Sequence, residues 1–148
     1  MYNTYVNDSS RPQTGFFSLL HGAGAVETFV EARLATVGLS LPKLAALHRL
    51  MESGESLPLG QLAERLACVK SNVTQLIDRL EADGLVARAP DPNDRRSRLA
   101  VITAKGKRAY EDGIRIQRAA EHELFGGFTT DETHQLAALL GKIQARTE

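Results

Sequence analysis

The chain has 148 residues, 43 % of them hydrophobic, and its 18 basic and 18 acidic side chains give a formal net charge of zero. This length fits one domain with short extensions at most, and the hydrophobic content is enough for an ordinary core. No apolar run reaches the roughly 18 residues of a membrane span, so no membrane association is expected. A balanced charge, taken alone, also argues against a nucleic-acid partner.

The zero net charge hides a local excess of basic residues. Between positions 70 and 108, nine lysines and arginines stand against five acidic residues, so this window carries +4 and the remainder carries −4. Chance variation in composition over a window of 39 residues would account for such an excess by itself. Because the window coincides with the motifs below, the asymmetry favours contact with DNA.

The single cysteine, Cys68, excludes an intramolecular disulfide framework and fits a reducing, cytoplasmic setting. It precedes a predicted helix, where a small buried packing residue is favoured. Redox control is the alternative, because Lys70 and a helix start lie nearby. The first 15 residues are polar, have no hydrophobic signal-peptide core and are expected to form a mobile arm.

The first helix is predicted over residues 16–37, because apolar residues recur there at spacings of three and four. Gly38 provides a helix stop. Gly22 and Gly24 weaken the helix, and either mark the close approach of a partner backbone or simply make it a poor helix. Its apolar positions are Leu20, Val26, Phe29, Val30 and Leu34.

Two shorter helices follow. Ser40 is a candidate N-cap of the first of them, with Pro42 in its first turn and Gly54 after its end. Its inward face consists of Leu44, Leu47, Leu50 and Met51. The next helix spans residues 59–66, and its apolar positions are Leu59, Leu62, Ala63 and Leu66.

A fourth helix is predicted over residues 71–83, with Gly84 at its end. Its inward positions, spaced i, i+3, i+4 and i+7, are Val73, Leu76, Ile77 and Leu80. The outward positions near its start carry short polar or basic side chains, which are Lys70, Ser71, Asn72, Thr74 and Gln75. These donors and acceptors suit the base edges of a DNA major groove, and Arg79 further along is placed for the phosphate backbone. An ordinary solvated helix face is the alternative.

Two short strands are predicted over residues 85–87 and 99–103, joined by the turn-forming residues 89–94. They form a small antiparallel hairpin whose tip, Asp94-Arg95-Arg96-Ser97-Arg98, places three guanidinium groups within four residues. Arginine is favoured in narrow minor grooves, where the potential is most negative. Asp94 can hold an arginine in position by a bidentate pair. A solvated charged turn is the alternative, but a basic hairpin directly after a polar-faced helix favours DNA.

Two more helices are predicted at the C-terminal end. Thr103 caps a long one over residues 104–125, which a Gly-Gly pair ends. A threonine at 129 or 130 caps the last, and Glu132 would complete a capping box with Thr129. Their apolar positions are Ala109, Ile114, Ile116, Ala120 and Leu124 in the first helix and Leu136, Leu139, Leu140 and Ile143 in the second.

Three segments together resemble the MarR family of bacterial transcription regulators, which are winged helix-turn-helix dimers. They are LAERL at 62–66, KSNVTQLIDRLEADGLV at 70–86 and DPNDRRSRLAVITAKGK at 91–107. The last holds the family's Asp-x-Arg wing signature as Asp94-Arg95-Arg96, before a strand that ends in Ile102-Thr103-Ala104-Lys105-Gly106. The family architecture also covers the rest of the chain, with helices before and after this central unit.

The resemblance implies a mainly α fold with a small β-hairpin wing, in which N- and C-terminal dimerisation helices flank a winged helix-turn-helix. After a mobile arm over 1–15, residues 16–148 would form a single domain. Residues 16–38 and 104–148 would be the dimerisation helices, and residues 40–103 the DNA-binding lobe.

The same resemblance implies roles for individual residues. The helix from Ser71 would enter the major groove, and Arg96 would enter the minor groove with Asp94 orienting it. Arg95 and Arg98 would contact phosphate. As a homodimer, the protein would read an inverted repeat with half-sites roughly 10 bp apart.

Family members often bind small phenolic or other aromatic acids between the dimerisation helices and the DNA-binding lobe, so a small aromatic or other organic effector is implied. His21, His48 and Tyr110 lie on helices that would line such a pocket, although each is more often a surface residue. Other members sense peroxide through a cysteine in the first helix, which this chain lacks, or metal through histidines and carboxylates. No two of the histidines (His21, His48, His122 and His134) stand four positions apart, so no metal site and no cofactor are expected.

These features predict a cytoplasmic, sequence-specific transcriptional regulator that binds double-stranded DNA and acts as a repressor. The alternative is a winged-helix protein-interaction module without a DNA role, which would not need three arginines at the wing tip. No enzyme is expected, because the sequence has no nucleophile–base pair, no glycine-rich phosphate loop and no ligand-spaced metal set. The operator, the effector and the regulated genes stay open.

Overall fold

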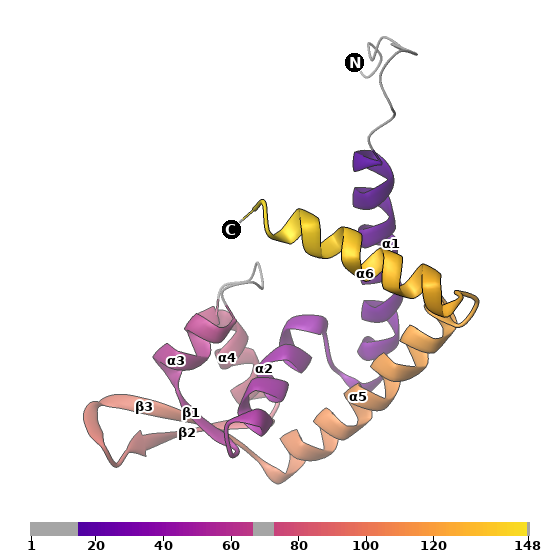
Figure 1. Cartoon of the computed structure of the whole chain (residues 1–148). Coiled ribbons are helices and arrows are strands. Elements are labelled where there is room, and N and C mark those ends of the chain that lie inside the picture. The colour runs from indigo at the N-terminus through magenta and orange to yellow at the C-terminus, as the bar shows by residue number, and fades with distance from the viewer. Residues whose placement is uncertain (1–14, 67–72, 148) are drawn as a thin grey trace, which may run out of the picture.

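The computed structural model describes residues 15–66 and 73–147. Within them the elements in chain order are α1 (Phe16–Leu34), the 3-10 turn η1 (Ala35–Val37), α2 (Leu41–Glu52), β1 (Ser56–Pro58), α3 (Leu59–Arg65), α4 (Val73–Ala82), β2 (Val86–Asp91), β3 (Asp94–Ile102), α5 (Ala104–Phe125) and α6 (Thr130–Gln144) (Figure 1). Three predicted features lie outside the described residues. They are the expected mobile arm apart from Gly15, the residue Cys68, and the start of the fourth predicted helix. The mainly helical fold with a small antiparallel sheet is confirmed.

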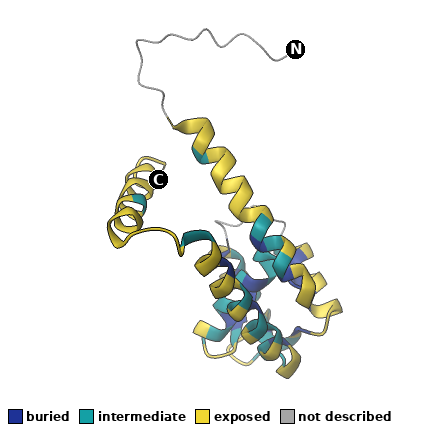
Figure 2. Cartoon of the chain, turned by 90° about the vertical axis from the view of Figure 1, so that its right-hand side faces the viewer, coloured by how far each residue is buried: buried dark blue, intermediate teal, exposed yellow. Residues whose placement is uncertain are grey.

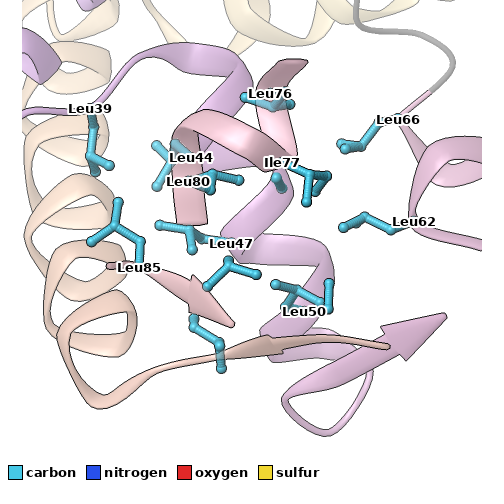
Figure 3. Close-up of a cluster of buried hydrophobic side chains, with 14 of the residues drawn as sticks. Leu39, Leu44, Leu47, Leu50, Leu62, Leu66, Leu76, Ile77, Leu80 and Leu85 are labelled. Atoms are coloured by element: carbon cyan, nitrogen blue, oxygen red, sulfur yellow. The ribbon is translucent and has the colours of Figure 1, made fainter. Parts of the chain in front are cut away.

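The main core lies where α2, α3 and α4 meet the sheet. Leu47, Leu50, Leu62 and Leu80 are completely buried, and their side chains converge from the three helices in Figure 3. Each helix contributes the aliphatic face that its 3.6-residue periodicity predicts, so hydrophobic burial sets how the three helices pack.

Three helix starts follow the predicted caps. The Ser40 hydroxyl accepts a hydrogen bond from the Lys43 amide at 3.3 Å, and Thr103 accepts one from the Gly106 amide at 2.9 Å. At α6, Thr129 and Glu132 form both hydrogen bonds of a capping box. Because each cap satisfies amides that have no partner inside the helix, these residues fix where α2, α5 and α6 begin.

The sheet has three strands, in the order β1-β3-β2, and not the two that the sequence predicted. The missed strand, β1, pairs antiparallel with β3, with Leu57 opposite Ala100. Three residues are too few to show the alternation of a strand. The position of β1 is therefore specified by its pairing with β3 and not by a hydrophobic pattern within β1 itself.

The hairpin strands are also longer than predicted. The turn expected over 89–94 is confined to residues 92 and 93, because β2 continues to Asp91 and β3 begins at Asp94. Pro90 is tolerated because β2 is an edge strand, and the strand register shifts between Pro90 and Asp91. As a result the wing arginines belong to β3, on a hairpin that projects from the helices in Figure 1.

The start of α5 packs closely against the segment between α4 and β2. A Cβ added at Gly106 would come within 2.1 Å of the Leu85 carbonyl oxygen and 2.8 Å of Ile102 Cγ1. The amide of Thr103 also donates to the Leu85 carbonyl at 3.1 Å. The long helix α5 is therefore attached tightly to the point where α4 turns into the wing.

We expect Gly106→Ala to lower the free energy of unfolding by about 2–3 kcal/mol, because the added methyl group would overlap backbone atoms. Thermal unfolding at a fixed protein concentration measures the loss. Gly60→Ala in α3 is the matched control, since a Cβ there meets no atom within 4 Å. The control should not lower stability, and it should raise it by up to about 1 kcal/mol because Ala is favoured over Gly in a helix. Equal stability of the Gly106→Ala and wild-type proteins would contradict this contact.

The two ends of the described chain bury little. In Figure 2 the N-terminal half of α1 and all of α6 are almost entirely exposed. Helix α6 has no buried residue although it carries the predicted apolar stripe, in which Leu139 is 58 % and Ile143 45 % exposed. None of the described helices is long and apolar enough to cross a membrane.

Candidate DNA-binding interface

Helix α4 separates an aliphatic face from a polar one. Its inward side chains are the predicted ones, and Leu76, Ile77 and Leu80 are buried against the core. Thr74, Gln75 and Arg79 are exposed on the other side. The remaining predicted contacts of this helix, which are Lys70, Ser71 and Asn72, lie outside the described residues.

The end of α4 leads directly into the wing. Gly84 has a φ of 73°, a left-handed conformation that glycine adopts without steric cost. Its amide donates to the Glu81 carbonyl at 2.9 Å, and the Leu85 amide donates to the Leu80 carbonyl at 2.9 Å. This C-terminal cap ends the helix and turns the chain at once into β2, so the helix and the wing are closely connected.

Arg88 joins the wing strand β2 to helix α4. Its guanidinium forms an ion pair with Asp78 at 2.6 Å and a second one with Glu81. The hydrogen bond to Asp78, together with the charges of both carboxylates, raises the pKa of Arg88 above its ordinary value. The sequence reasoning counted Arg88 only as part of the basic excess. Its role in the structure is to hold the wing against α4.

The wing contains a different contact from the predicted bidentate pair. An Asp94 carboxylate oxygen accepts a hydrogen bond from the backbone amide of Arg96 at 2.9 Å. Within the described residues, Asp94 forms no ion pair with an arginine. At this position a short acidic side chain satisfies a backbone donor, so Asp94 shapes the strand and leaves the Arg96 guanidinium available.

Basic side chains near the wing are not all equally available to a partner. Lys105 donates to the Asp83 carbonyl at 2.7 Å, and Lys107 pairs with Glu55 at 2.6 Å. By contrast, across the part of the chain that the structure describes, no ion pair engages the exposed side chains of Arg79, Arg95, Arg96 and Arg98.

The faces of the sheet also indicate where one of these arginines points. Arg98 pairs with Pro90, and Arg88 pairs with Ala100 two positions along each strand. Because side chains alternate between the faces of a sheet, Arg98 lies on the same face as Arg88, which contacts α4. At least one wing arginine therefore lies on the sheet face from which Arg88 contacts α4.

A separate cavity of about 570 Å³ lies between α1, α2 and α5. Its lining includes His48, which the sequence analysis had considered and set aside. The His48 ring lies 3.0 Å from the Tyr110 hydroxyl through Nδ1 and 3.2 Å from Glu52 through Nε2. The described residues hold no group of three or more His, Cys, Asp or Glu side chains that could bind a metal ion.

Comparison with known proteins decides the family. The model of the MarR family matches residues 39–97, from the start of α2 to the wing. The chain is 36 % identical over 105 residues to the HTH-type transcriptional regulator YkoM of Bacillus subtilis (strain 168), covering 71 % of this chain and 68 % of YkoM. It is 35 % identical over 129 residues to the transcriptional activatory protein BadR of Rhodopseudomonas palustris, covering 84 % of this chain and 74 % of BadR. The chain belongs to the MarR family.

A solved structure extends the likeness beyond the matched segment. CouR from Rhodococcus jostii RHA1, solved with p-coumaroyl-CoA bound, is 29 % identical and superposes with a TM-score of 0.73 over 88 % of this chain and 92 % of CouR. MarR-family proteins are transcriptional regulators, and the matching relatives include proteins named as repressors as well as BadR. The winged helix-turn-helix predicted from the sequence is thus confirmed as the fold and function class of this chain.

Proposed function

We propose that this MarR-family regulator is a homodimeric repressor that binds an inverted-repeat DNA operator. The observation that carries the proposal is an exposed polar face on α4 next to a wing that Arg88 holds to this helix, and whose Arg95, Arg96 and Arg98 have no ion pair in the described chain. Several matching relatives are named as repressors, which supports repression as the direction of regulation. A DNA target would place the protein in the cytoplasm.

Residues 40–103 form the proposed DNA-binding lobe. Thr74 and Gln75, with Lys70, Ser71 and Asn72 before them, would contact base edges in the major groove. Arg79 would contact phosphate from the same helix. The wing would place Arg96 in the minor groove and use Arg95 and Arg98 for phosphate, with Asp94 shaping the strand between them.

Dimerisation through residues 16–38 and 104–148 would cover the apolar surfaces that one chain leaves exposed. Helix α6 has 15 residues and buries none of them, and an isolated helix of this length is only marginally stable in water. Phe16, Phe17 and Leu20 of α1 are each more than half exposed. Among the described residues beyond the surrounding turns of α1, no atom would lie within 4 Å of a Cβ at Gly22 or Gly24, which leaves room for the backbone of a second copy.

The cavity between α1, α2 and α5 is the proposed effector site. CouR is solved with p-coumaroyl-CoA bound, so a small-molecule effector is a reasonable expectation in this fold. Helix α5 lines the cavity and, through Gly106, packs at its other end against the corner between α4 and β2. A ligand that shifts α5 would therefore change the position of both DNA-contacting elements, which is a route to release of the operator.

Selection of binding sites from a random double-stranded DNA pool tests this function. We expect an inverted repeat with half-sites roughly 10 bp apart and affinity that falls steeply with salt. Gln75→Ala should change the selected bases, because an amide discriminates between base pairs. Arg79→Ala should weaken all sequences alike and lower the salt slope by about one.

Two outcomes would argue against this function. If the protein binds DNA but selects no sequence, the proposed base contacts of α4 are wrong. A complete absence of DNA binding at low salt would instead favour the winged-helix protein-interaction module.

A further inference from the structure

The side chains around the cavity combine an apolar wall with negative charge. The apolar lining consists of Val26, Val30, Leu41, Leu44, Ala45, Ile114, Leu124 and Phe125. The polar lining consists of Glu27 on α1, His48 on α2, and Gln117 and Glu121 on α5. Lysine and arginine do not occur among these described lining residues, and the acidic ones are two exposed glutamates from different helices.

Neither carboxylate is neutralised within the described chain, because no ion pair there involves Glu27 or Glu121. The nearby cation of α1 is already engaged. Arg33 pairs with Glu123 at 2.9 Å, and its guanidinium carbon lies 3.3 Å from the centre of the Phe29 ring. Arg33 is also not among the residues that line the cavity.

His48 is also a poor partner for an anion. Both of its ring nitrogens have neighbours, the Tyr110 hydroxyl at 3.0 Å and Glu52 at 3.2 Å. With Nε2 donating to Glu52, Nδ1 would accept from Tyr110, which leaves no ring donor for a ligand. An anionic ligand would therefore meet two like charges and no free cation among the lining side chains.

We propose that this cavity binds an organic cation, an amine or quaternary ammonium group on an apolar or aromatic body. The cavity volume of about 570 Å³ lies in the usual range for small-molecule sites. Its apolar wall would hold the body of the ligand, while Glu27 and Glu121 attract the charge. The inference rests on the proposed function only in treating the ligand as the effector. An organic cation differs in charge from the aromatic acids that the family resemblance implies.

Three naphthalene probes of similar size and different charge test the proposal. They are naphthylethylammonium, the neutral naphthylethanol and the anionic naphthylacetate, each titrated against the full-length protein without DNA and followed by naphthyl fluorescence. We expect the ammonium to bind roughly tenfold more tightly than the alcohol, which is the combined effect of two partly exposed charge pairs. The acetate should bind most weakly.

The double variant Glu27→Gln/Glu121→Gln should abolish the preference for the ammonium and keep the affinity for the alcohol, which also reports that the cavity has folded. Glu111→Gln is the matched control, because Glu111 is exposed on α5 and lies outside the cavity lining. This control should retain the preference of the wild-type protein.

The proposal is overturned if none of the probes binds, if the acetate binds as tightly as the ammonium, or if the preference survives the double variant. Tighter binding of the acetate that is lost in Arg118→Gln, the nearest α5 arginine in sequence to Gln117, would make the cavity an anion site. Because the titration contains no DNA, its result is separate from the operator selection. If the ammonium binds as expected but the protein selects no operator, the cation-site proposal stands and the proposed function is wrong.

Discussion

Arg96→Ala is expected to reduce affinity for the selected operator by roughly 10²–10⁴-fold. Removing a charged hydrogen-bond donor costs about 1.5–3 kcal/mol per contact, and a dimer would lose one contact in each of two wings. Arg96 is exposed, so its loss should change the free energy of unfolding by no more than about 0.5 kcal/mol. Fluorescence anisotropy with labelled operator, together with thermal unfolding, measures the two quantities.

Arg115→Ala is the control for this variant. Arg115 also carries an exposed guanidinium, but it lies on α5 and pairs with Asp112. It should lose little affinity, because a general loss of positive charge acts weakly at a distance beyond the Debye length. If the Arg96→Ala and wild-type proteins bind the operator equally well, Arg96 does not contact DNA, whatever the stability of the variant.

The helix boundaries could be predicted because local chemistry sets them. Ser40, Thr103 and Thr129 each satisfy an amide three residues ahead, and this interaction depends only on neighbouring residues. Gly38 and Gly84 have φ values of 72° and 73°, and few residues other than glycine tolerate this conformation. Such signals are readable in a single sequence.

The sheet was harder to predict because pairing joins distant residues. Leu57 of β1 is buried and lies opposite Ala100, more than forty positions further along the chain. The turn chemistry of residues 89–94 was real, but Pro90 is compatible with an edge strand. Composition alone does not distinguish a proline in a turn from one at the edge of a sheet.

Charge counting was also incomplete, since it does not show which charges are paired. Arg88 contributes to the local excess of +4, yet two carboxylates of α4 neutralise it. The lining of the cavity illustrates the same limit. Glu27 and Glu121 come together at one cavity from opposite ends of the sequence, so neither was a candidate before the structure was known.

The double variant Leu139→Asp/Ile143→Asp is expected to convert the protein to a monomer and to weaken operator binding about 100-fold or more. Both side chains lie on the exposed stripe of α6, and charges there would oppose burial against a second copy. A monomer loses the gain from binding two half-sites at once, which is typically 10²–10⁴-fold. Light scattering after size exclusion should give 16.1 kDa for the variant and twice that mass for the wild type.

Ala138→Asp provides the control, because it places one aspartate on the same helix but away from the apolar stripe. It should stay dimeric and bind the operator like the wild type. A wild-type protein that elutes as a monomer, or a stripe variant that remains a dimer, would contradict the proposed interface. A monomeric variant with full operator affinity would instead separate dimerisation from DNA recognition, and the inverted-repeat operator would lose its physical basis.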